Sequence, residues 1–266
     1  MPTKLGQNFL QDKDIARKIV DWAELEPHDL VIEVGPGKGI LTADIAKRVK
    51  KIIAVEIDEN LAALLKNKFK DNKNIEIINS DILKTDLKKL ITSSGLRIVN
   101  YHVIANIPYY ITSLIIRFFL ENSFPPSKML LMVQKEVAER ITAAPGKMSL
   151  LAVSVQYYAQ AELLFSVDKK FFSPIPSVDS AVIRITRNPK SETFSQEKNR
   201  KFFRIVRAGF SAKRKTLVNN LSNSLHLDKK LITKQIKKIS LSETVRAQEL
   251  SLTDWKKLVN LFSEII

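Results

Sequence analysis

The sequence has no cysteine among its 266 residues. Disulfide bonds, cysteine-containing metal sites and cysteine nucleophiles are therefore excluded. It has only three histidines, His28, His102 and His226, and they stand far apart in the sequence. A histidine-rich metal site is therefore not expected, and we predict that the protein uses no metal.

A long, purely apolar segment is also missing. The first residues contain no apolar core of signal-peptide length. The uncharged run 98–116 is about as long as a membrane span, but it contains polar residues and a proline, including Asn106 and Pro108. A membrane helix would bury them at high cost. We expect a soluble, monomeric protein of the cytoplasm that does not bind membranes.

Acidic residues are scarce in the last part of the chain. Residues 201–266 contain 14 lysines and arginines but only 5 acids, which gives this segment a net charge of +9 out of +15 for the whole chain. A basic segment of this kind favours a polyanionic partner such as RNA. The alternative is an ordinary, solvated lysine-rich surface.

Short apolar runs alternate with helical patterns through the first half of the chain. This rhythm predicts an α/β fold with a parallel sheet covered by helices on both faces. Two later runs, 161–168 and 177–186, are predicted to form a strand pair at a sheet edge. The apolar runs are DLVIEVG (29–35), KIIAVEID (51–58), IEIINSD (75–81), HVIANIP (102–108) and KMLLMVQ (128–134).

Helical patterns begin and end the chain. Residues 12–25 have helical spacing, with Asp12 or Asp14 as the N-cap. A polar stretch predicts a linker at 188–199, between a domain at 1–187 and a helical domain at 200–266. The predicted helices of this second domain are 200–210, 213–225, 228–238, 243–249 and 253–265.

The first strand is followed by a glycine-rich turn, EVGPGKGILT (33–42). The dinucleotide fingerprint requires a third glycine where Ile40 stands, and a P-loop requires Ser or Thr after Lys38, where Gly39 stands. The turn therefore lets the backbone approach a ligand closely, but it predicts neither a dinucleotide nor a nucleoside triphosphate.

Polar side chains recur where the predicted strands end. Glu33, Glu56, Asp81 and Asn106 follow one another at intervals of 23, 25 and 25 residues. In a parallel sheet these ends share the edge where ligands bind. One acid can accept two ribose hydroxyls and the next an adenine amino group, so a nucleoside without phosphates fits best, with S-adenosylmethionine as the obvious candidate. The alternative is that Glu56 and Asp81 are helix caps or first-turn acids.

The segment NIPY (106–109) closes the fourth of these strands. Pro108 keeps Ile107 extended, so the Asn106 amide oxygen and the Ile107 carbonyl can face a ligand as two acceptors. Two acceptors match an exocyclic amino group, and Tyr109 supplies a ring on which a base can stack. The alternative is a strand that ends in a proline turn with a buried tyrosine.

Seven segments in order resemble the ribosomal-RNA adenine N6-dimethyltransferase family. The resemblance covers nearly the whole chain and implies a Rossmann-like, S-adenosylmethionine-dependent methyltransferase sheet with a small helical C-terminal domain. The segments are GQNFL (6–10), EVGPGKGILT (33–42), VEID (55–58), NSDIL (79–83), ANIPYYITS (105–113), FFSPIPSVDSAVIRI (171–185) and RAGFSAKRKTLVNNL (207–221).

Two branches of the family are considered. PSVDSAV (176–182) and FSAKRKTLVNNL (210–221) favour the kasugamycin-resistance branch, which dimethylates two adjacent adenines in the 3′-terminal hairpin of small-subunit (16S) rRNA. The resemblance therefore implies small-subunit rRNA, or the immature small ribosomal subunit, as partner. The second branch, the erythromycin-resistance methyltransferases of large-subunit rRNA, often has Ile after the Asn, as here, but lacks the RKTL helix.

The resemblance also implies roles for individual residues. Asn106, with Ile107 and Pro108, would hold the target nitrogen, and Tyr109 and Phe172 would stack on the flipped adenine. The implied cofactor residues are Asn8, Leu10, Gly35, Glu56, Asp81 and Asn106, and the expected RNA contacts are Arg207, Lys213, Arg214 and Lys215. Taken alone, FFSPIP (171–176) favours aromatic residues that fill the core. The basic run 213–215, with Arg207, favours the start of a helix that faces RNA, and the alternative is a solvated charged surface.

The chain departs from the family pattern in two places. Tyr110 stands where the family usually has Asn, and the loop 143–151 is shorter than usual. Two other classes of function stay open from the sequence. One is a non-catalytic RNA-binding or ribosome-assembly factor, and the other is a small-molecule methyltransferase that would not need residues 200–266.

Overall fold

The computed structural model describes residues 7–95, 100–188 and 196–262. The chain divides into two compact units. The first comprises Met1–Ala138 and Gln160–Arg187, and the second comprises Glu139–Ala159 and Asn188–Ile266.

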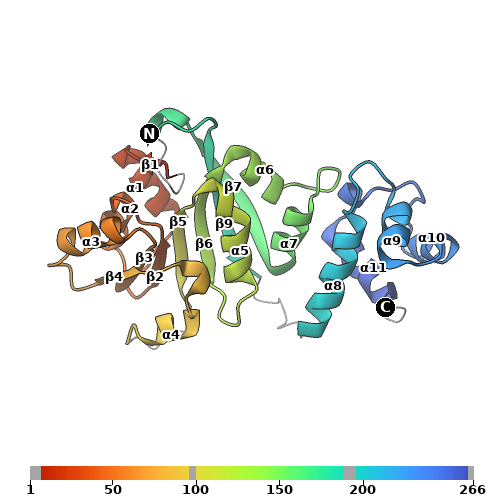
Figure 1. Cartoon of the computed structure of the whole chain (residues 1–266), viewed down its shortest axis with the longest axis horizontal. Helices are drawn as coiled ribbons and strands as arrows, with labels where there is room; N and C mark the ends of the chain where they lie inside the picture. Colours follow the sequence, from red (N-terminus) through yellow and green to blue (C-terminus); the bar gives the residue numbers. More distant parts are fainter. Residues whose placement is uncertain (1–6, 96–99, 189–195, 263–266) are drawn as a thin grey trace. The chain divides into compact units, whose positions relative to one another are not determined.

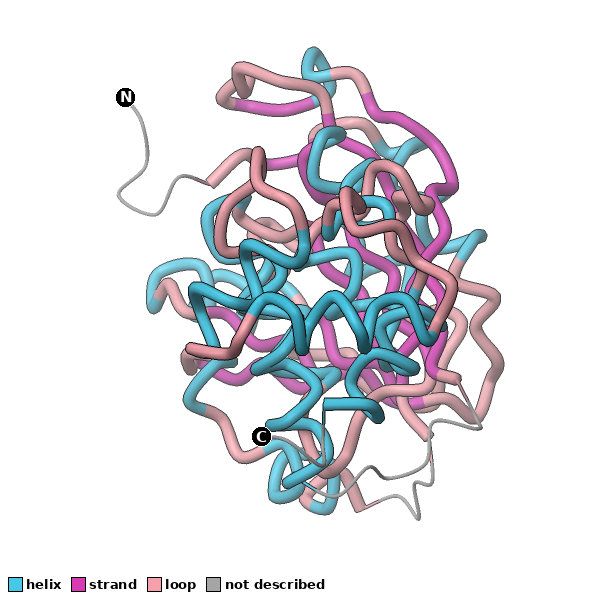
Figure 2. The backbone as a smooth tube through the Cα atoms, turned by 90° about the vertical axis from the view of Figure 1, so that its right-hand side faces the viewer, coloured by secondary structure: helices cyan, strands magenta, loops and turns pink. Residues whose placement is uncertain are grey.

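A seven-stranded sheet with the order β4-β3-β2-β5-β6-β9-β7 forms the centre of the first unit (Figures 1 and 2). The five strands from β4 to β6 are parallel, and β9 runs antiparallel to β6. This confirms the predicted parallel sheet and the two neighbouring strands at its edge. The strands are β2 (Leu30–Val34), β3 (Lys51–Glu56), β4 (Ile75–Asn79), β5 (His102–Asn106), β6 (Lys128–Gln134), β7 (Ala159–Val167) and β9 (Ser180–Arg187).

Helices flank this sheet (Figure 1). Every residue of β2 is buried, as expected for a parallel strand that is covered on both faces. The first helix has Asp12 as its N-cap, because the Asp12 carboxylate accepts hydrogen bonds from the backbone N–H of Asp14 and Ile15. The helices that begin in this unit are α1 (Lys13–Trp22), α2 (Ile40–Ile45), α3 (Glu59–Lys68), α4 (Leu87–Thr92), α5 (Thr112–Leu120) and α6 (Lys135–Ile141).

A second, two-stranded sheet joins distant parts of the first unit. Strand β1 (Phe9–Leu10) pairs antiparallel with β8 (Phe172–Ser173). The described residues also include four short 3-10 turns. They are η1 (Ile82–Lys84), η2 (Tyr109–Ile111), η3 (Lys169–Phe171) and η4 (Ala247–Glu249).

The second unit is built from helices around an aromatic core. Trp255 is fully buried in it, and the Tyr157 ring stacks on Phe202 with 4.1 Å between ring centroids. The predicted helix at 243–249 is wrong, because only the turn η4 forms there. The helices that lie wholly in this unit are α7 (Leu150–Tyr158), α8 (Gln196–Gly209), α9 (Leu217–Leu225), α10 (Lys229–Lys238) and α11 (Leu252–Phe262).

The two units do not coincide with the sequence-based domains. The sequence analysis assigned 139–159 to the first domain, whereas the apolar residues of α7 pack into the core of the second unit with α8 and the helices that follow it. Composition does not show which core an apolar helix joins. The linker prediction, 188–199, falls mostly outside the described residues, and the boundaries at 187 and 200 stay a prediction.

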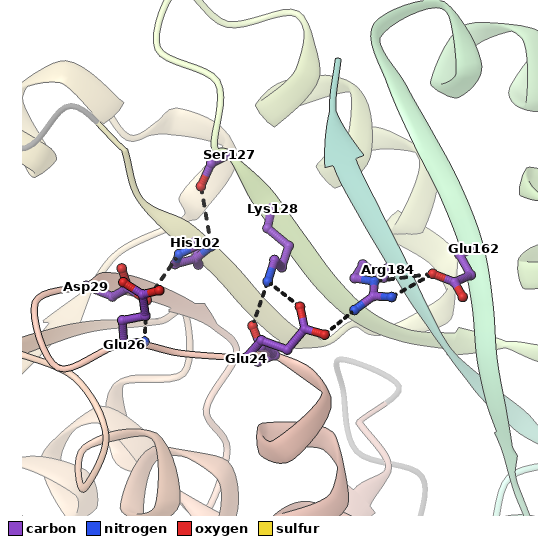
Figure 3. Close-up of polar contacts among 9 residues, drawn as sticks. Glu24, Glu26, Asp29, His102, Ser127, Lys128, Glu162 and Arg184 are labelled. Carbon is purple, nitrogen blue, oxygen red and sulfur yellow. Dashed lines mark hydrogen bonds and ion pairs between the residues drawn. The ribbon is translucent and has the colours of Figure 1, made fainter. Parts of the chain in front are cut away.

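Ion pairs connect neighbouring segments at the amino-terminal edge of the large sheet (Figure 3). The Lys128 ammonium donates to the Ala23 carbonyl and to the Glu24 carboxylate, both at 3.0 Å. Arg184 donates to the other oxygen of Glu24 at 3.0 Å and to Glu162 at 2.8 Å. These two cations lower the pKa of Glu24, with the hydrogen bond from Lys128 as the largest cause. The carboxylate therefore links the end of α1 to strands β6 and β9.

A histidine continues this edge. His102, at the start of β5, faces Asp29 with 3.2 Å between Nε2 and Oδ2, and Ser127 lies 3.4 Å from its Nδ1 (Figure 3). Burial lowers the pKa of His102, and Asp29 opposes that shift only in part. His102 is therefore neutral near pH 7 and acts as a hydrogen-bonding side chain rather than a fixed charge.

We expect Glu24→Gln to lower the free energy of unfolding by about 1 kcal/mol, because Lys128 and Arg184 both lose the charge that they share. Urea unfolding at low and high salt measures this, and the loss should shrink at high salt. Glu26→Gln is the matched control, since the Glu26–His28 pair is mostly exposed. Equal losses in the two variants would contradict a special role for Glu24.

Candidate active site

A cavity opens at the carboxyl edge of the large sheet, where β2, β3, β4 and β5 end. Its empty space, counted with the open mouth, is about 1080 Å³. The cavity is lined by residues 7–10, 33–38, 40–41, 55–57, 80–82 and 106–111. These ranges include every predicted cofactor residue, Asn8, Leu10, Gly35, Glu56, Asp81 and Asn106, together with Ile107, Pro108 and Tyr109.

Two backbone N–H groups hold the Glu56 carboxylate at the end of β3. Gly37 donates to Oε2 and Asp58 donates to Oε1, both at 3.0 Å. Gly37 has a φ of +58°, and a Cβ there would lie 2.9 Å from the Phe9 ring. A glycine is therefore required at this turn. The two bonds orient the carboxylate and leave each oxygen a lone pair for hydroxyl groups in the cavity.

Asp81 caps a turn and also lines the cavity, so its position agrees with both alternatives from the sequence, a cap and an acid at the ligand edge. Its Oδ1 accepts a hydrogen bond of 3.0 Å from the backbone N–H of Leu83, so it caps the turn η1. It also lines the cavity, and its Oδ2 lies 3.9 Å from the Lys84 ammonium. The cap fixes the side chain, and an acceptor oxygen remains for a ligand amino group.

The sequence analysis placed Glu33 at the ligand edge of the sheet but gave it no role, and Glu33 lines the cavity. It is 1% exposed, and Thr42 donates to it with 2.7 Å between the oxygens. Burial raises the pKa of Glu33 to about 8, and the charge of Glu56 adds to that effect. Glu33 therefore holds its proton at neutral pH. The available signal was an acid inside the apolar run DLVIEVG.

The Asn106 amide has a fixed orientation. Its Nδ2 donates to the Asn8 carbonyl at 3.1 Å, so its Oδ1 is left as an acceptor. The backbone N–H of Ile107 donates to the Met132 carbonyl at 3.1 Å. Within the part of the chain that the structure describes, the Ile107 carbonyl accepts no hydrogen bond. The two acceptors that the sequence predicted are thus both available.

The two candidate stacking rings differ in their surroundings. Tyr109 lines the cavity, and its hydroxyl lies 2.8 Å from the Ser180 hydroxyl. Burial raises the pKa of Tyr109, so the phenol stays neutral. Phe172 is 3% exposed, packs in the core and does not line the cavity. Its stacking on a base stays a prediction, and it would require the ring to leave this packing.

The predicted RNA contacts lie in the second unit. Arg207 is exposed on α8, and Lys213, Arg214 and Lys215 are exposed in the turn before α9. The sequence analysis missed Arg200 and Arg204, which are exposed on the same helix. Their spacing of four and three residues places them on one face with Arg207. The helical spacing of the three arginines was the signal that would have identified them.

Among the described residues, no group of three or more His, Asp or Glu side chains is arranged to hold a metal ion. The same residues include no helix of sufficient length and apolarity to span a membrane.

The pKa of Glu33 predicts a pH-dependent stability. The native state binds this proton more tightly than the unfolded chain, so the contribution is complete below the unfolded pKa of about 4.5 and is lost as the pH rises through about 8. We expect wild type to lose stability relative to Glu33→Gln between pH 5.5 and 9, measured as the difference between their thermal midpoints. A difference that does not change with pH would contradict a raised pKa.

Known proteins are similar to this chain in sequence and in fold. Ribosomal RNA small subunit methyltransferase A of Dehalococcoides mccartyi is 42% identical over 254 residues, which is 96% of this chain and 86% of that protein. The protein of the same name from Fusobacterium nucleatum is 41% identical over 97% of this chain and 96% of its own length.

Two solved structures match nearly the whole chain. A dimethyladenosine transferase from Plasmodium falciparum has a TM-score of 0.79 and 25% identity, and covers 96% of this chain and 98% of its own. The 23S rRNA methyltransferase ErmE has a TM-score of 0.75 and 26% identity, and covers 95% and 98%. The model of the family described as ribosomal RNA adenine dimethylase matches residues 1–264. The chain therefore belongs to the ribosomal RNA adenine dimethylase family.

Proposed function

We propose that this protein transfers methyl groups from S-adenosylmethionine to N6 of two adjacent adenines in the 3′-terminal hairpin of small-subunit rRNA, during assembly of that subunit in the cytoplasm. The observation that carries the proposal is the pair of acceptors, Asn106 Oδ1 and the Ile107 carbonyl, beside a cavity lined by Glu56 and Asp81, whose carboxylates can accept hydrogen bonds from a nucleoside. The small-subunit branch is favoured over the large-subunit one because the small-subunit relatives named above are 41–42% identical, against 26% for ErmE.

The residues of the cavity fit S-adenosylmethionine, which supplies an electrophilic methyl group when it is bound. Glu56 would accept the two ribose hydroxyls, and Asp81 would accept from the adenine amino group. Gly35, with a φ of +65°, would let the backbone approach the methionine part closely. Asn8 and Leu10 would close the cavity from the N-terminal segment.

The target adenine must leave its stack to reach these acceptors. Asn106 Oδ1 and the Ile107 carbonyl would each accept one N6 proton, which aims the nitrogen lone pair at the methyl group. Positioning of this kind can lower a barrier by roughly 7–11 kcal/mol. Asn106 is a weak base, so the proton of the alkylated nitrogen passes to water. After one transfer N6 keeps one proton, and one acceptor suffices to orient it for the second.

We expect Asn106→Ala to lower kcat at least about 100-fold, because the amine loses one acceptor and the lone pair is no longer oriented. Cofactor affinity, measured by calorimetry, should change much less. Asn67→Ala, on the exposed side of α3, is the matched control and should behave as wild type. A near-normal rate in Asn106→Ala would rule out this mechanism.

The substrate itself is tested with unmethylated small ribosomal subunits and labelled S-adenosylmethionine, followed by nuclease digestion and mass spectrometry. Two dimethylated neighbouring adenines near the 3′ end are expected. Label on large subunits instead would favour the large-subunit alternative. Absence of saturable cofactor binding would favour a non-catalytic assembly factor.

The second unit would hold the RNA backbone. Arg200, Arg204 and Arg207 form one face of α8, and none is paired with an acid in the described parts of the chain. Free cations on one helical face suit phosphate groups, and the basic turn 213–215 adds three more exposed cations. Such a surface positions RNA without reading its sequence.

Replacing these three arginines by glutamine should weaken binding to small-subunit rRNA. The slope of log K against log salt should become shallower by about 2, because each lost phosphate contact contributes roughly 0.7–0.9. The matched control replaces Lys229, Lys230 and Lys234 on α10, which removes the same charge. Filter binding across a salt series measures both variants. Equal slope changes would mean that net charge, rather than this face, controls binding.

A further inference from the structure

Tyr110 lies at the mouth of the cavity, and its side chain does not anchor the fold. It lines the cavity beside Tyr109, yet 65% of it is exposed. Tyr109 is anchored to Ser180, whereas the Tyr110 hydroxyl has no hydrogen bond to any described residue. An aromatic ring that stays exposed at a ligand cavity is typical of a contact made only when the partner is bound.

Other apolar side chains are exposed near the contact between Tyr109 and Ser180, on the segment after η2 and on the loop before β9. Leu114 follows Tyr110 by four residues and is 52% exposed. Ile175 and Val178, 66% and 42% exposed, belong to the loop between β8 and β9, which the Tyr109–Ser180 contact joins to the turn η2. Single exposed apolar residues are ordinary. Here they lie near the Tyr110 ring, which no hydrogen bond holds in place, at the cavity that the substrate must enter.

We propose that the Tyr110 ring is the stacking platform for the RNA base next to the target adenine. The proposal rests on the proposed function. Successive side chains of a 3-10 turn point about 120° apart, because the turn has three residues. Tyr109 can therefore face the inserted adenine while Tyr110 faces the neighbouring base that stays outside.

Charge at the same place favours RNA as the occupant rather than a protein partner. The exposed residues Lys135 and Lys169 adjoin the β8–β9 loop, because their backbone N–H groups donate to the Asp179 carbonyl and carboxylate, both at 3.0 Å. Neither lysine forms an ion pair in the described parts of the chain, although the adjacent Asp168 interacts electrostatically with Lys169 and is paired with Lys170. Exposed aromatic rings beside cations are the usual surface for single-stranded nucleic acid.

The test combines protein and RNA changes. Small subunits are reconstituted with rRNA whose 3′-terminal segment is a ligated synthetic oligonucleotide, in which an abasic residue replaces each neighbour of the methylated adenine in turn. We expect Tyr110→Ala to lower kcat/KM about tenfold on intact RNA, the usual size of one stacked base. At one of the abasic positions, kcat/KM of the wild-type enzyme should fall by the same factor. Tyr110→Ala acting on that abasic RNA should show no further fall in kcat/KM.

Tyr110→Phe is the matched control, because it keeps the ring and should retain both the rate and the dependence on the neighbouring base. Thermal unfolding checks that Tyr110→Ala folds, as expected for an exposed side chain. Additive losses at every abasic position would overturn the proposal. So would an unchanged kcat/KM in Tyr110→Ala, which would point to another partner for this ring.

Two further results would also overturn it. If Tyr110→Ala weakens S-adenosylmethionine binding by the same factor as kcat/KM, the ring belongs to the cofactor site. If Tyr110→Phe is as slow as Tyr110→Ala, the hydroxyl rather than the ring acts. Failure of the proposed function is distinguishable, because wild type would then transfer no methyl group to intact small subunits.

Discussion

Parallel, in-register pairing of the central strands is the constraint on which the active site depends. Val34 pairs with Val55 on one side and Ala105 on the other, and Glu56 pairs with Asn79. Because parallel strands end at the same edge, residues tens of positions apart are brought together. Strand pairing alone therefore brings Glu56, Asp81 and Asn106 to one edge of the sheet.

The short N-terminal segment connects parts of the site that the large sheet does not join. The Asn8 carbonyl orients the Asn106 amide, the Phe9 ring covers the Gly37 turn, and Leu10 pairs with Phe172. Residues 8–10 therefore contact the Gly37 turn, the Asn106 amide and strand β8.

The two edges of the large sheet differ in how their polar groups are satisfied. At the amino-terminal edge, Lys128 and Arg184 share the Glu24 carboxylate, and the charges compensate one another. At the carboxyl edge, Glu33 is buried and protonated near neutral pH. Asn106 Oδ1 and the Ile107 carbonyl accept no hydrogen bond from the described residues. The first edge stabilises the fold, whereas the second keeps hydrogen-bonding capacity for ligands.

The sequence by itself determined the parallel sheet and the shared edge at which Glu33, Glu56, Asp81 and Asn106 lie, because strand rhythm and the intervals between these residues can be read along the chain. Only the tertiary structure decided which way the Asn106 amide points, that Phe172 is buried, that Glu33 retains its proton and that α7 packs in the helical unit. Each of these depends on contacts between segments far apart in sequence. Residues 8 and 106, for example, interact across 98 positions, and no periodicity records such a contact.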